Sequence, residues 1–218
     1  MATIGENLQQ VKARLAGARG VTLLAVSKSQ PVDAIRAAVA AGQTAFGENY
    51  VQEAIEKMNA LPKLEWHLIG PLQSNKTRVV AERFDWVQTV ASEKIARRLS
   101  EQRPASLPAL NVLIQVNASG ESTKSGVAPA AVAALASSIS ALKGIRLRGL
   151  MAIPEPGAPR ERYRSVKKLY DGLKAEHGFD TLSLGMSDDM DVAIAEGSTM
   201  VRIGTAIFGA RKTHKSAA

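Results

Sequence analysis

The sequence predicts an α/β fold, a closed (β/α)8 barrel with an extra helix before the first strand, formed by residues 1–218 as a single domain. Eight short β-rich runs alternate with helical segments, which is typical of a parallel sheet with right-handed crossovers. Several runs, such as LNVLIQV, are continuously apolar, as expected for parallel strands buried on both faces. The length also fits, because small barrels of the TIM type begin near about 200 residues.

The first half of the chain opens with a helix at 5–18, where apolar residues recur at helical spacing. A nearly continuous apolar strand follows at 21–27. Pro31 at the start and Gly42 at the end are expected to bound the second helix. The remaining elements of this half are expected at 45–47 (strand), 50–60 (helix), 65–69 (strand), 74–83 (helix, with Ser74 as a possible cap) and 86–90 (strand).

The second half continues the alternation. Ser92 can cap the next helix, and the proline-rich stretch 104–108 is expected to be a loop. The later elements are expected at 110–116 (strand), 117–126 (polar loop), 129–142 (helix), 145–153 (strand), 154–159 (loop), 160–176 (helix), 181–184 (strand), 188–196 (helix) and 200–208 (strand). Eight strand–helix units favour closure into a barrel over an open sheet.

Composition excludes several kinds of site. The chain has no cysteine, which rules out disulfides, thiolate catalysis and cysteine-ligated metals, and fits a reducing cytoplasm. The histidines at 67, 177 and 214 show no ligand spacing, so no metal site is expected. No apolar run approaches the roughly 18 residues that span a bilayer, and the N-terminus lacks the apolar region of a signal peptide. We therefore expect a cytoplasmic protein without membrane contact.

The formal net charge of +8 allows two interpretations. Nucleic-acid binding is one, because basic domains often bind phosphate backbones. The basic residues are dispersed, however, and no zinc finger or RNP-like aromatic motif accompanies them. A generally basic surface, with or without an anionic ligand, is the simpler interpretation, and we expect no nucleic-acid partner.

Lys28 directly follows the first strand, where a barrel places its active site. A partly desolvated lysine has a lowered pKa and becomes an amine nucleophile that can form an imine with an aldehyde or ketone. The alternative is a solvated lysine that marks the end of a strand. Position alone favours that alternative.

The ends of the last two strands carry Gly185, Ser187, Gly204 and Thr205. Loops at this place bind phosphate in many barrels, and a helix starting near Ser187-Asp188 would direct its N-terminus toward an anion. Ordinary turns and caps use the same residue types. A phosphate site beside an imine-forming lysine suggests a phosphorylated carbonyl compound, so a pyridoxal phosphate protein and a class I aldolase both fit.

Arg202 lies two residues before Gly204 and is expected on the same side of its strand. An inward arginine is costly in a barrel unless an acceptor meets it. A salt bridge to a buried carboxylate and contact with a ligand remain open as explanations.

Several longer motifs carry a family resemblance over nearly the whole chain. They are LLAVSKSQP around Lys28, FGENYVQE at 46–53, EWHLIGPLQSNK at 65–76, GLMAIP at 149–154, LSLGMSDDM at 182–190 and VRIGTAIFG at 201–209. Together they resemble the pyridoxal phosphate homeostasis proteins, the YggS-like family. The resemblance implies a fold like the N-terminal barrel of bacterial alanine racemase.

The same resemblance implies roles for particular residues. Lys28 would hold pyridoxal 5′-phosphate (PLP) as a Schiff base, and Arg202 would face the pyridine nitrogen. Ser187, Gly204 and Thr205 would contact the phosphate. Two further residues lie in family motifs near the pocket, namely Asn49 and His67.

The function implied is a PLP-binding protein that acts in intracellular vitamin B6 and amino-acid homeostasis, without catalysis of its own. A PLP-dependent amino-acid racemase is the alternative, and an aldolase is more remote. The chain stops soon after the last strand, where racemases continue into a second domain that supplies a tyrosine base, and none of its own tyrosines lies in an equivalent segment. We expect a monomer, with PLP-dependent apoenzymes as possible recipients of the cofactor.

Overall fold

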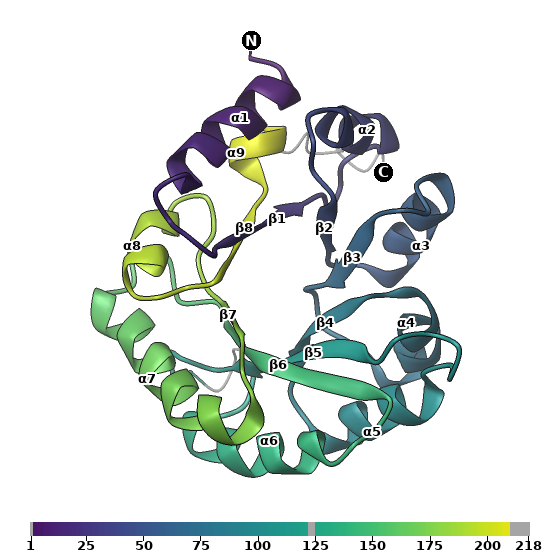
Figure 1. The fold of residues 1–218 in the computed structure, drawn as a ribbon, viewed down its shortest axis with the longest axis vertical. Helices are drawn as coiled ribbons and strands as arrows, with labels where there is room; N and C mark the ends of the chain where they lie inside the picture. The colour runs from purple at the N-terminus through teal and green to yellow at the C-terminus, as the bar shows by residue number, and fades with distance from the viewer. Residues whose placement is uncertain (1, 122–124, 210–218) are drawn as a thin grey trace, which may run out of the picture.

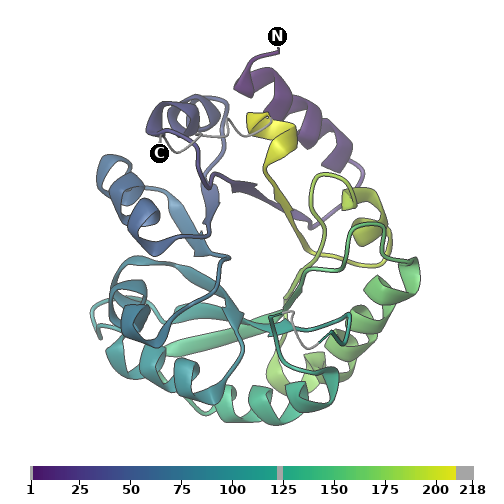
Figure 2. The same ribbon diagram turned by 180° about the vertical axis from the view of Figure 1, so that it is seen from behind.

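The computed structural model describes residues 2–121 and 125–209, and its eight strands form a closed parallel barrel in chain order (Figures 1 and 2). This confirms the predicted fold class. The strands are β1 (Thr22–Val26), β2 (Ala45–Glu48), β3 (Glu65–Leu68), β4 (Trp86–Val90), β5 (Leu110–Val116), β6 (Ile145–Ala152), β7 (Thr181–Ser183) and β8 (Met200–Ile203). Pairing between β1 and β8 closes the ring, with Leu24 opposite Arg202.

Helices surround the barrel on the outside (Figure 1). They are α1 (Ile4–Leu15), α2 (Val32–Ala40), α3 (Val51–Ala60), η1 (Ser74–Lys76), α4 (Thr77–Arg83), α5 (Glu93–Gln102), η2 (Pro129–Ala131), α6 (Val132–Ser140), α7 (Arg160–His177), α8 (Met190–Ala195) and α9 (Thr205–Phe208). The extra N-terminal helix α1 is present. It begins with a capping box in which the Thr3 side chain accepts from the Glu6 backbone and the Glu6 carboxylate accepts from Thr3.

The predicted strand 200–208 was wrong in its second half. β8 ends at Ile203, and Thr205–Phe208 forms the short helix α9, which packs on α1. Ile207 is fully buried there, and the Asn7 side chain donates to its carbonyl at 3.0 Å. A short apolar run does not by itself distinguish strand from helix. The helix forms because it buries its apolar side against α1.

The two predicted serine caps have different outcomes. Ser92 accepts from the Ile95 backbone N–H at 3.4 Å and caps α5, as predicted. Ser74 does not cap α4, because a 3₁₀ turn precedes the helix and Lys76 occupies the cap position without a side-chain bond. The Ser74 carbonyl instead accepts from the Thr77 hydroxyl at 2.9 Å.

Inside the barrel, side chains form layers because alternate residues of each strand point inward. β3 illustrates this pattern. Glu65 lines a cavity at the N-terminal ends of the strands, His67 is fully buried, and Ile69 lines cavities at the C-terminal ends. The middle of the barrel is unusually polar, since His67, Gln88 and Ser183 have no exposed surface.

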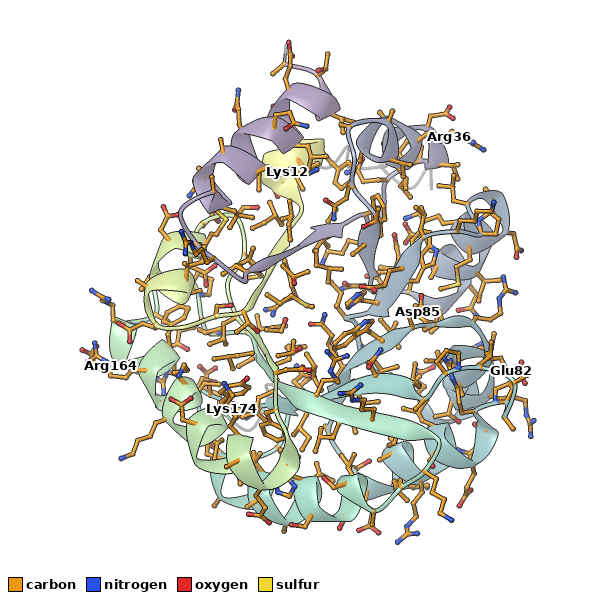
Figure 3. The ribbon with its side chains drawn as sticks, in the orientation of Figure 1. Lys12, Arg36, Glu82, Asp85, Arg164 and Lys174 are labelled. Atoms are coloured by element: carbon orange, nitrogen blue, oxygen red, sulfur yellow. The ribbon has the colours of Figure 1, made fainter. Side chains whose placement is uncertain are left out.

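The main apolar core lies between the strands and the surrounding helices, and two small apolar clusters lie apart from it. Charged side chains such as Arg36, Glu82 and Arg164 point away from the ring on its periphery (Figure 3). In the described part of the chain, no helix combines the length and apolar character needed to cross a bilayer.

Candidate functional site

A cavity of about 220 Å³ opens at the C-terminal ends of the strands. It brings together six of the seven residues predicted for the site. These are Lys28, Asn49, Ser187, Arg202, Gly204 and Thr205. Apolar walls come from Val26, Ile69, Ile153 and Met186, of which Ile153 and Met186 are large apolar residues with 43% and 38% exposure. These walls were not predicted from the sequence, although Ile153 directly follows β6 and could have been found by its position.

Lys28 lies in the turn just beyond β1, which ends at Val26. The next residue, Ser29, has a φ of 60°, a left-handed conformation that is uncommon outside glycine. The backbone N–H of Ser29 donates to Oε1 of Glu53 at 2.5 Å. The conformation of this turn is therefore fixed from α3, which carries Glu53.

A buried ion-pair cluster holds the other side of the turn. Lys57 is 3% exposed, and its ammonium donates to Glu48 Oε1 at 2.7 Å, Glu53 Oε1 at 2.6 Å and the Ser27 carbonyl at 2.7 Å. The Ser27 hydroxyl also donates to Glu48 Oε1, at 2.5 Å. All three ammonium hydrogens are thus used, and Ser27 and Ser29 on either side of Lys28 are tied to one cluster.

The guanidinium of Arg202 is 3% exposed and is met by oxygen acceptors rather than by a carboxylate. Nη1 donates to the carbonyl and hydroxyl of Ser183 at 2.8 and 2.7 Å, and Nη2 donates to the Ala152 carbonyl at 2.9 Å. Within residues 2–121 and 125–209, Arg202 takes part in no ion pair, so the salt-bridge alternative does not describe its surroundings. Burial lowers the pKa of Arg202 to about 10, which leaves it protonated at neutral pH.

Ser187, Gly204 and Thr205 lie together on one side of the cavity. The Ser187 hydroxyl accepts from the Ala206 backbone N–H at 3.4 Å, which joins the loop after β7 to the first turn of α9. The 185–189 loop is fixed by Asp189, which accepts from Met186 N at 2.5 Å and from the Tyr163 hydroxyl at 2.6 Å. These contacts hold glycine and hydroxyl groups at the place where an anion would be bound.

The helix predicted to start near Ser187-Asp188 begins instead at Met190. Asp189 occupies its N-cap position, and its carboxylate turns back to the loop. The predicted start of this helix is therefore about two residues too early. Loop residues, and not α8, line this part of the cavity.

Asn49 lines both the 220 Å³ cavity and a neighbouring one of about 340 Å³. Its backbone lies against Gly70, where an added Cβ would come within 2.1 Å of the Asn49 carbonyl oxygen. Gly70 therefore allows the close approach that places Asn49 at the mouth.

The structure does not bring His67 to the mouth. Its ring is fully buried in the barrel, stacked on Trp86 with ring centroids 5.0 Å apart. Nε2 contacts Glu65 Oε1 at 2.7 Å and Nδ1 contacts Gln88 Nε2 at 3.0 Å. Burial lowers the pKa of His67, which favours a neutral ring. In the described ranges no group of three or more histidine and acidic side chains could hold a metal, and His214 lies outside them.

The cavity as a whole fits a flat ring that carries an anionic arm and a reactive carbonyl. The apolar walls suit the ring, the glycine and hydroxyl groups suit the anion, and Lys28 supplies a primary amine. Arg202 adds N–H donors, since its three bonds to Ser183 and Ala152 use three of the five that a guanidinium carries.

Comparisons with known proteins agree on a family. The family model of the alanine racemase N-terminal domain matches residues 1–212. The pyridoxal phosphate homeostasis protein of Pseudomonas aeruginosa is 56% identical, with 97% of each chain covered. The protein of the same name in Escherichia coli is 52% identical, with 99% of this chain and 100% of the relative covered.

Solved structures show the same similarity. PipY of Synechococcus elongatus with PLP bound has a TM-score of 0.85 and 37% identity, covering 95% of this chain and 100% of PipY. Alanine racemase from Corynebacterium glutamicum has a TM-score of 0.78 at 18% identity, covering 98% of this chain and 62% of the racemase. The second similarity concerns the fold alone.

Proposed function

This chain belongs to the alanine racemase N-terminal domain family, and we propose that it binds PLP covalently through Lys28 and acts in PLP homeostasis. The observation that supports this most directly is the convergence of six predicted residues on one cavity at the C-terminal mouth of the barrel. The names of relatives at 50–56% identity, and the PLP-bound PipY structure, support the same ligand.

PLP supplies an aldehyde that condenses with a primary amine and releases one water molecule. In the proposed complex Lys28 would provide that amine. Ser187, Gly204 and Thr205 bind the phosphate through hydroxyl and backbone N–H groups. Asn49 lines both this cavity and the neighbouring one of about 340 Å³.

Arg202 is proposed to donate to the pyridine nitrogen. Because its pKa of about 10 keeps it protonated at neutral pH, it can only donate a hydrogen bond. The ring nitrogen must accept that bond with an unprotonated lone pair, so the ring stays neutral. A neutral ring withdraws electrons less strongly from a carbon next to the bound nitrogen. This property supports a protein that holds and releases PLP over one that catalyses decarboxylation or transamination, and it is compatible with racemisation.

A racemase is the alternative function. Racemisation needs a second acid/base group on the face of the substrate opposite Lys28. Tyr163 is committed to Asp189 at 2.6 Å, and burial raises its pKa, so it does not suit that role. We expect purified protein loaded with PLP to leave L-alanine in deuterated water unracemised. Formation of the D-enantiomer at about 1 per second or faster, within the usual range of enzymes, would favour the racemase.

The binding proposal is tested by borohydride reduction. The loaded protein should be yellow, lose its colour on reduction, and yield a peptide with the reduced adduct on Lys28. Lys28→Ala should abolish the adduct, whereas Lys63→Ala, at an exposed position, should keep it. A full adduct in the Lys28→Ala protein would contradict the proposal.

The phosphate contacts are tested with pyridoxal that lacks the phosphate. Losing several hydrogen bonds to a charged group, each contributing roughly 1.5–3 kcal/mol, should weaken binding at least about a hundredfold. Equal affinity for the two aldehydes would argue against the assigned phosphate residues.

Further parts of the proposal concern the setting of the protein. They are that residues 1–218 act as one domain, that the protein is a cytoplasmic monomer, and that it delivers PLP to apoenzymes. Light scattering tests whether the protein is a monomer. Delivery is tested by incubating the loaded protein with a PLP-free enzyme, which should gain more PLP than the same concentration of free PLP would give it.

A further inference from the structure

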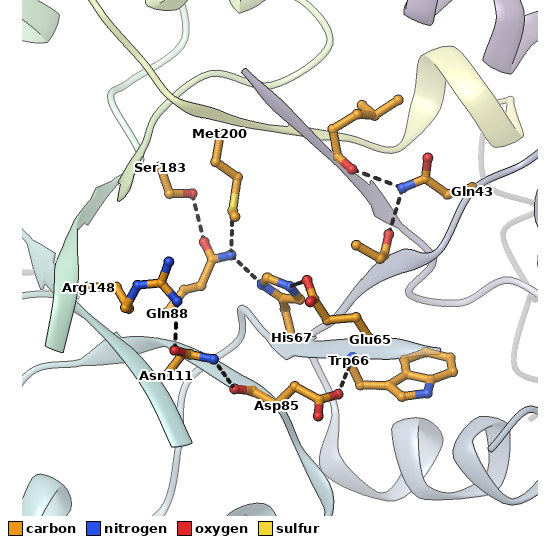
Figure 4. A network of polar contacts seen from close by, with 12 residues as sticks. Gln43, Glu65, Trp66, His67, Asp85, Gln88, Asn111, Arg148, Ser183 and Met200 are labelled. Atoms are coloured by element: carbon orange, nitrogen blue, oxygen red, sulfur yellow. Dashed lines mark hydrogen bonds and ion pairs between the residues drawn. The ribbon is translucent and has the colours of Figure 1, made fainter. Parts of the chain in front are cut away.

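A chain of hydrogen bonds crosses the barrel interior and ends at Arg202. Arg202 Nη1 contacts the Ser183 hydroxyl at 2.7 Å, and that hydroxyl contacts Gln88 Oε1 at 2.7 Å. Gln88 Nε2 contacts His67 Nδ1 at 3.0 Å, and His67 Nε2 contacts Glu65 Oε1 at 2.7 Å. Figure 4 shows Gln88 between Ser183 and His67, with Glu65 beyond the histidine.

The two ends of this chain fix the direction of every bond in it. A guanidinium only donates and an ionised carboxylate only accepts. Since Ser183 accepts from Arg202, its own hydrogen goes to Gln88. The amide oxygen of Gln88 is thereby used, so its nitrogen faces His67.

The same logic then sets the histidine. Nδ1 of His67 accepts from Gln88, and Nε2–H donates to Glu65. Burial holds the pKa of His67 down, and the bond from His67 holds the pKa of Glu65 down. A neutral ring and an ionised carboxylate are the states that this direction requires.

Each inner residue of this hydrogen-bond chain has little freedom to change its orientation or its partners. Ser183, Gln88 and His67 are fully buried. Gln88 Nε2 also contacts the Met200 sulfur at 3.1 Å, and the His67 ring is stacked on Trp86 at an interplanar angle of 7°. A flip of the Gln88 amide would break bonds on both sides, so the chain has one arrangement.

We infer that Ser183, Gln88 and His67 are positioning residues that orient Arg202 toward the pyridine nitrogen of the bound cofactor. The inference rests on the proposed function, because it concerns how Arg202 meets PLP. Two of the five N–H groups of Arg202 are not used by Ser183 or Ala152. The chain would determine where those two groups point.

Glu65 is the last residue of the hydrogen-bond chain and lies at the mouth of the barrel opposite Lys28. Its side chain is 47% exposed and lines a cavity of about 570 Å³ at the N-terminal ends of the strands. In a low-dielectric interior, successive hydrogen bonds polarise one another. A charge change at Glu65 should therefore reach Arg202 in weakened form.

The experiment compares PLP with 1-deaza-PLP, in which a CH group replaces the ring nitrogen. The measured quantity is the ratio of their dissociation constants, from absorbance titrations of each purified variant. A variant that merely loosens the fold weakens both ligands alike and leaves the ratio unchanged. Differences in aldehyde reactivity between the ligands cancel when ratios are compared between variants.

Wild type should prefer PLP by about tenfold or more, as expected for a hydrogen bond from a charged donor. Ser183→Ala and Gln88→Met should bring the ratio close to that of Arg202→Leu. Glu65→Gln, at a half-exposed position that should not disturb folding, should reduce the ratio by a smaller factor. Ser198→Ala is the matched control, because Ser198 is 4% exposed and bonded only to backbone around β7 and β8.

The outcomes separate the inference from the proposed function. If wild type binds neither aldehyde, the proposed function fails. If it binds PLP but Ser183→Ala, Gln88→Met and Glu65→Gln all keep the wild-type ratio, the inference is overturned. A ratio that falls equally in Ser198→Ala would also overturn it, because the effect would then not belong to the chain.

Discussion

The two sides of the proposed cofactor site are held in opposite ways. Lys28 sits in a turn fixed by a buried ion-pair cluster, in which Lys57 bridges Glu48 and Glu53. Arg202 is fixed by neutral groups, the carbonyls and hydroxyl that meet it and the chain through Gln88. One side is held by opposite charges, and the other by dipoles aligned in one direction.

The two sides also differ in how many of their buried polar atoms have hydrogen-bond partners. Glu48 is fully buried, and its Oε2 has no partner among the described residues. Burial therefore raises the pKa of Glu48 despite the neighbouring Lys57. In the hydrogen-bond chain from Arg202, the inner residues are neutral and fully paired. Gln88 uses its oxygen and its nitrogen, and His67 uses both ring nitrogens. A buried ion pair leaves a costly charge when one partner is lost, whereas a neutral chain leaves only an unpaired dipole.

Breaking the charged side should have the largest effect. Lys57→Met leaves Glu48 buried without its cation, and we expect a loss of roughly 3–5 kcal/mol in the free energy of unfolding. Urea unfolding measures it, with Lys63→Met at an exposed position as the control. The double variant Glu48→Gln/Lys57→Met should recover part of the loss. A loss in Lys57→Met below about 1 kcal/mol would contradict the assigned role of the ion pair.

Breaking the neutral side should cost less. Ser183→Ala leaves Gln88 Oε1 and one Arg202 N–H without the hydroxyl, while the Ser183 carbonyl still accepts from Arg202. We expect a loss of about 1–3 kcal/mol, measured by the same urea titration. If this loss exceeded that of Lys57→Met, the contrast between the two sides would be wrong.

The ion-pair cluster and the hydrogen-bond chain, which support the two sides, also show what could not be predicted from the sequence. Strand ends could be located from apolar runs, and in a barrel strand ends meet at one mouth, so six of the seven residues predicted for the site line one cavity there. The supports join Lys57 to Ser27 and Gln88 to Ser183, which are 30 and 95 residues apart. Such pairs depend on strand register and helix docking, which a single sequence does not specify.

His67 shows a second limit. It lies in a family motif, yet strand alternation places it in the middle layer of the barrel rather than at the mouth. Its link to the cofactor, if the chain acts as inferred, passes through Gln88 and Ser183. A motif can therefore be associated with a ligand without containing a contact to it.

The pH dependence of stability should have opposite signs on the two sides. Between its lowered folded pKa and the ordinary value of 6.5, His67 is protonated only when unfolded, so acidification favours unfolding. Between the ordinary value of 4.5 and its raised folded pKa, Glu48 is protonated only when folded, so rising pH favours unfolding. A folded pKa that lies one pH unit from its unfolded value changes the free energy of unfolding by about 1.4 kcal/mol.

Difference curves isolate the two groups. We expect the stability of wild type minus His67→Gln to rise as the pH approaches 6.5 from below, and that of wild type minus Glu48→Gln to fall as the pH rises above 4.5. The titration of Glu65 also changes when His67 is replaced, because His67 holds the pKa of Glu65 below 4.5, but that change falls below the pH range in which His67 is tested. If the two stability differences changed with pH in the same direction, the electrostatic contrast between the two sides would be wrong.

The smallest effect is expected at Ser29, where the charged side imposes a strained backbone. Its φ of 60° costs an L-residue roughly 1–2 kcal/mol, which Ser29→Gly should relieve. Glycine loses more conformational freedom on folding, which costs roughly 0.5–1 kcal/mol. The net change should therefore be a gain in unfolding free energy of between zero and about 1.5 kcal/mol. The bond from the residue 29 N–H to Glu53 is kept, so the adduct on Lys28 should form as in wild type.

Ser29→Pro removes that N–H and cannot adopt the φ of 60°, so this variant should lose both stability and the adduct. If Ser29→Gly instead lost the adduct while remaining folded, the Lys28 turn would depend on the serine side chain and not on the backbone geometry set by the ion-pair cluster.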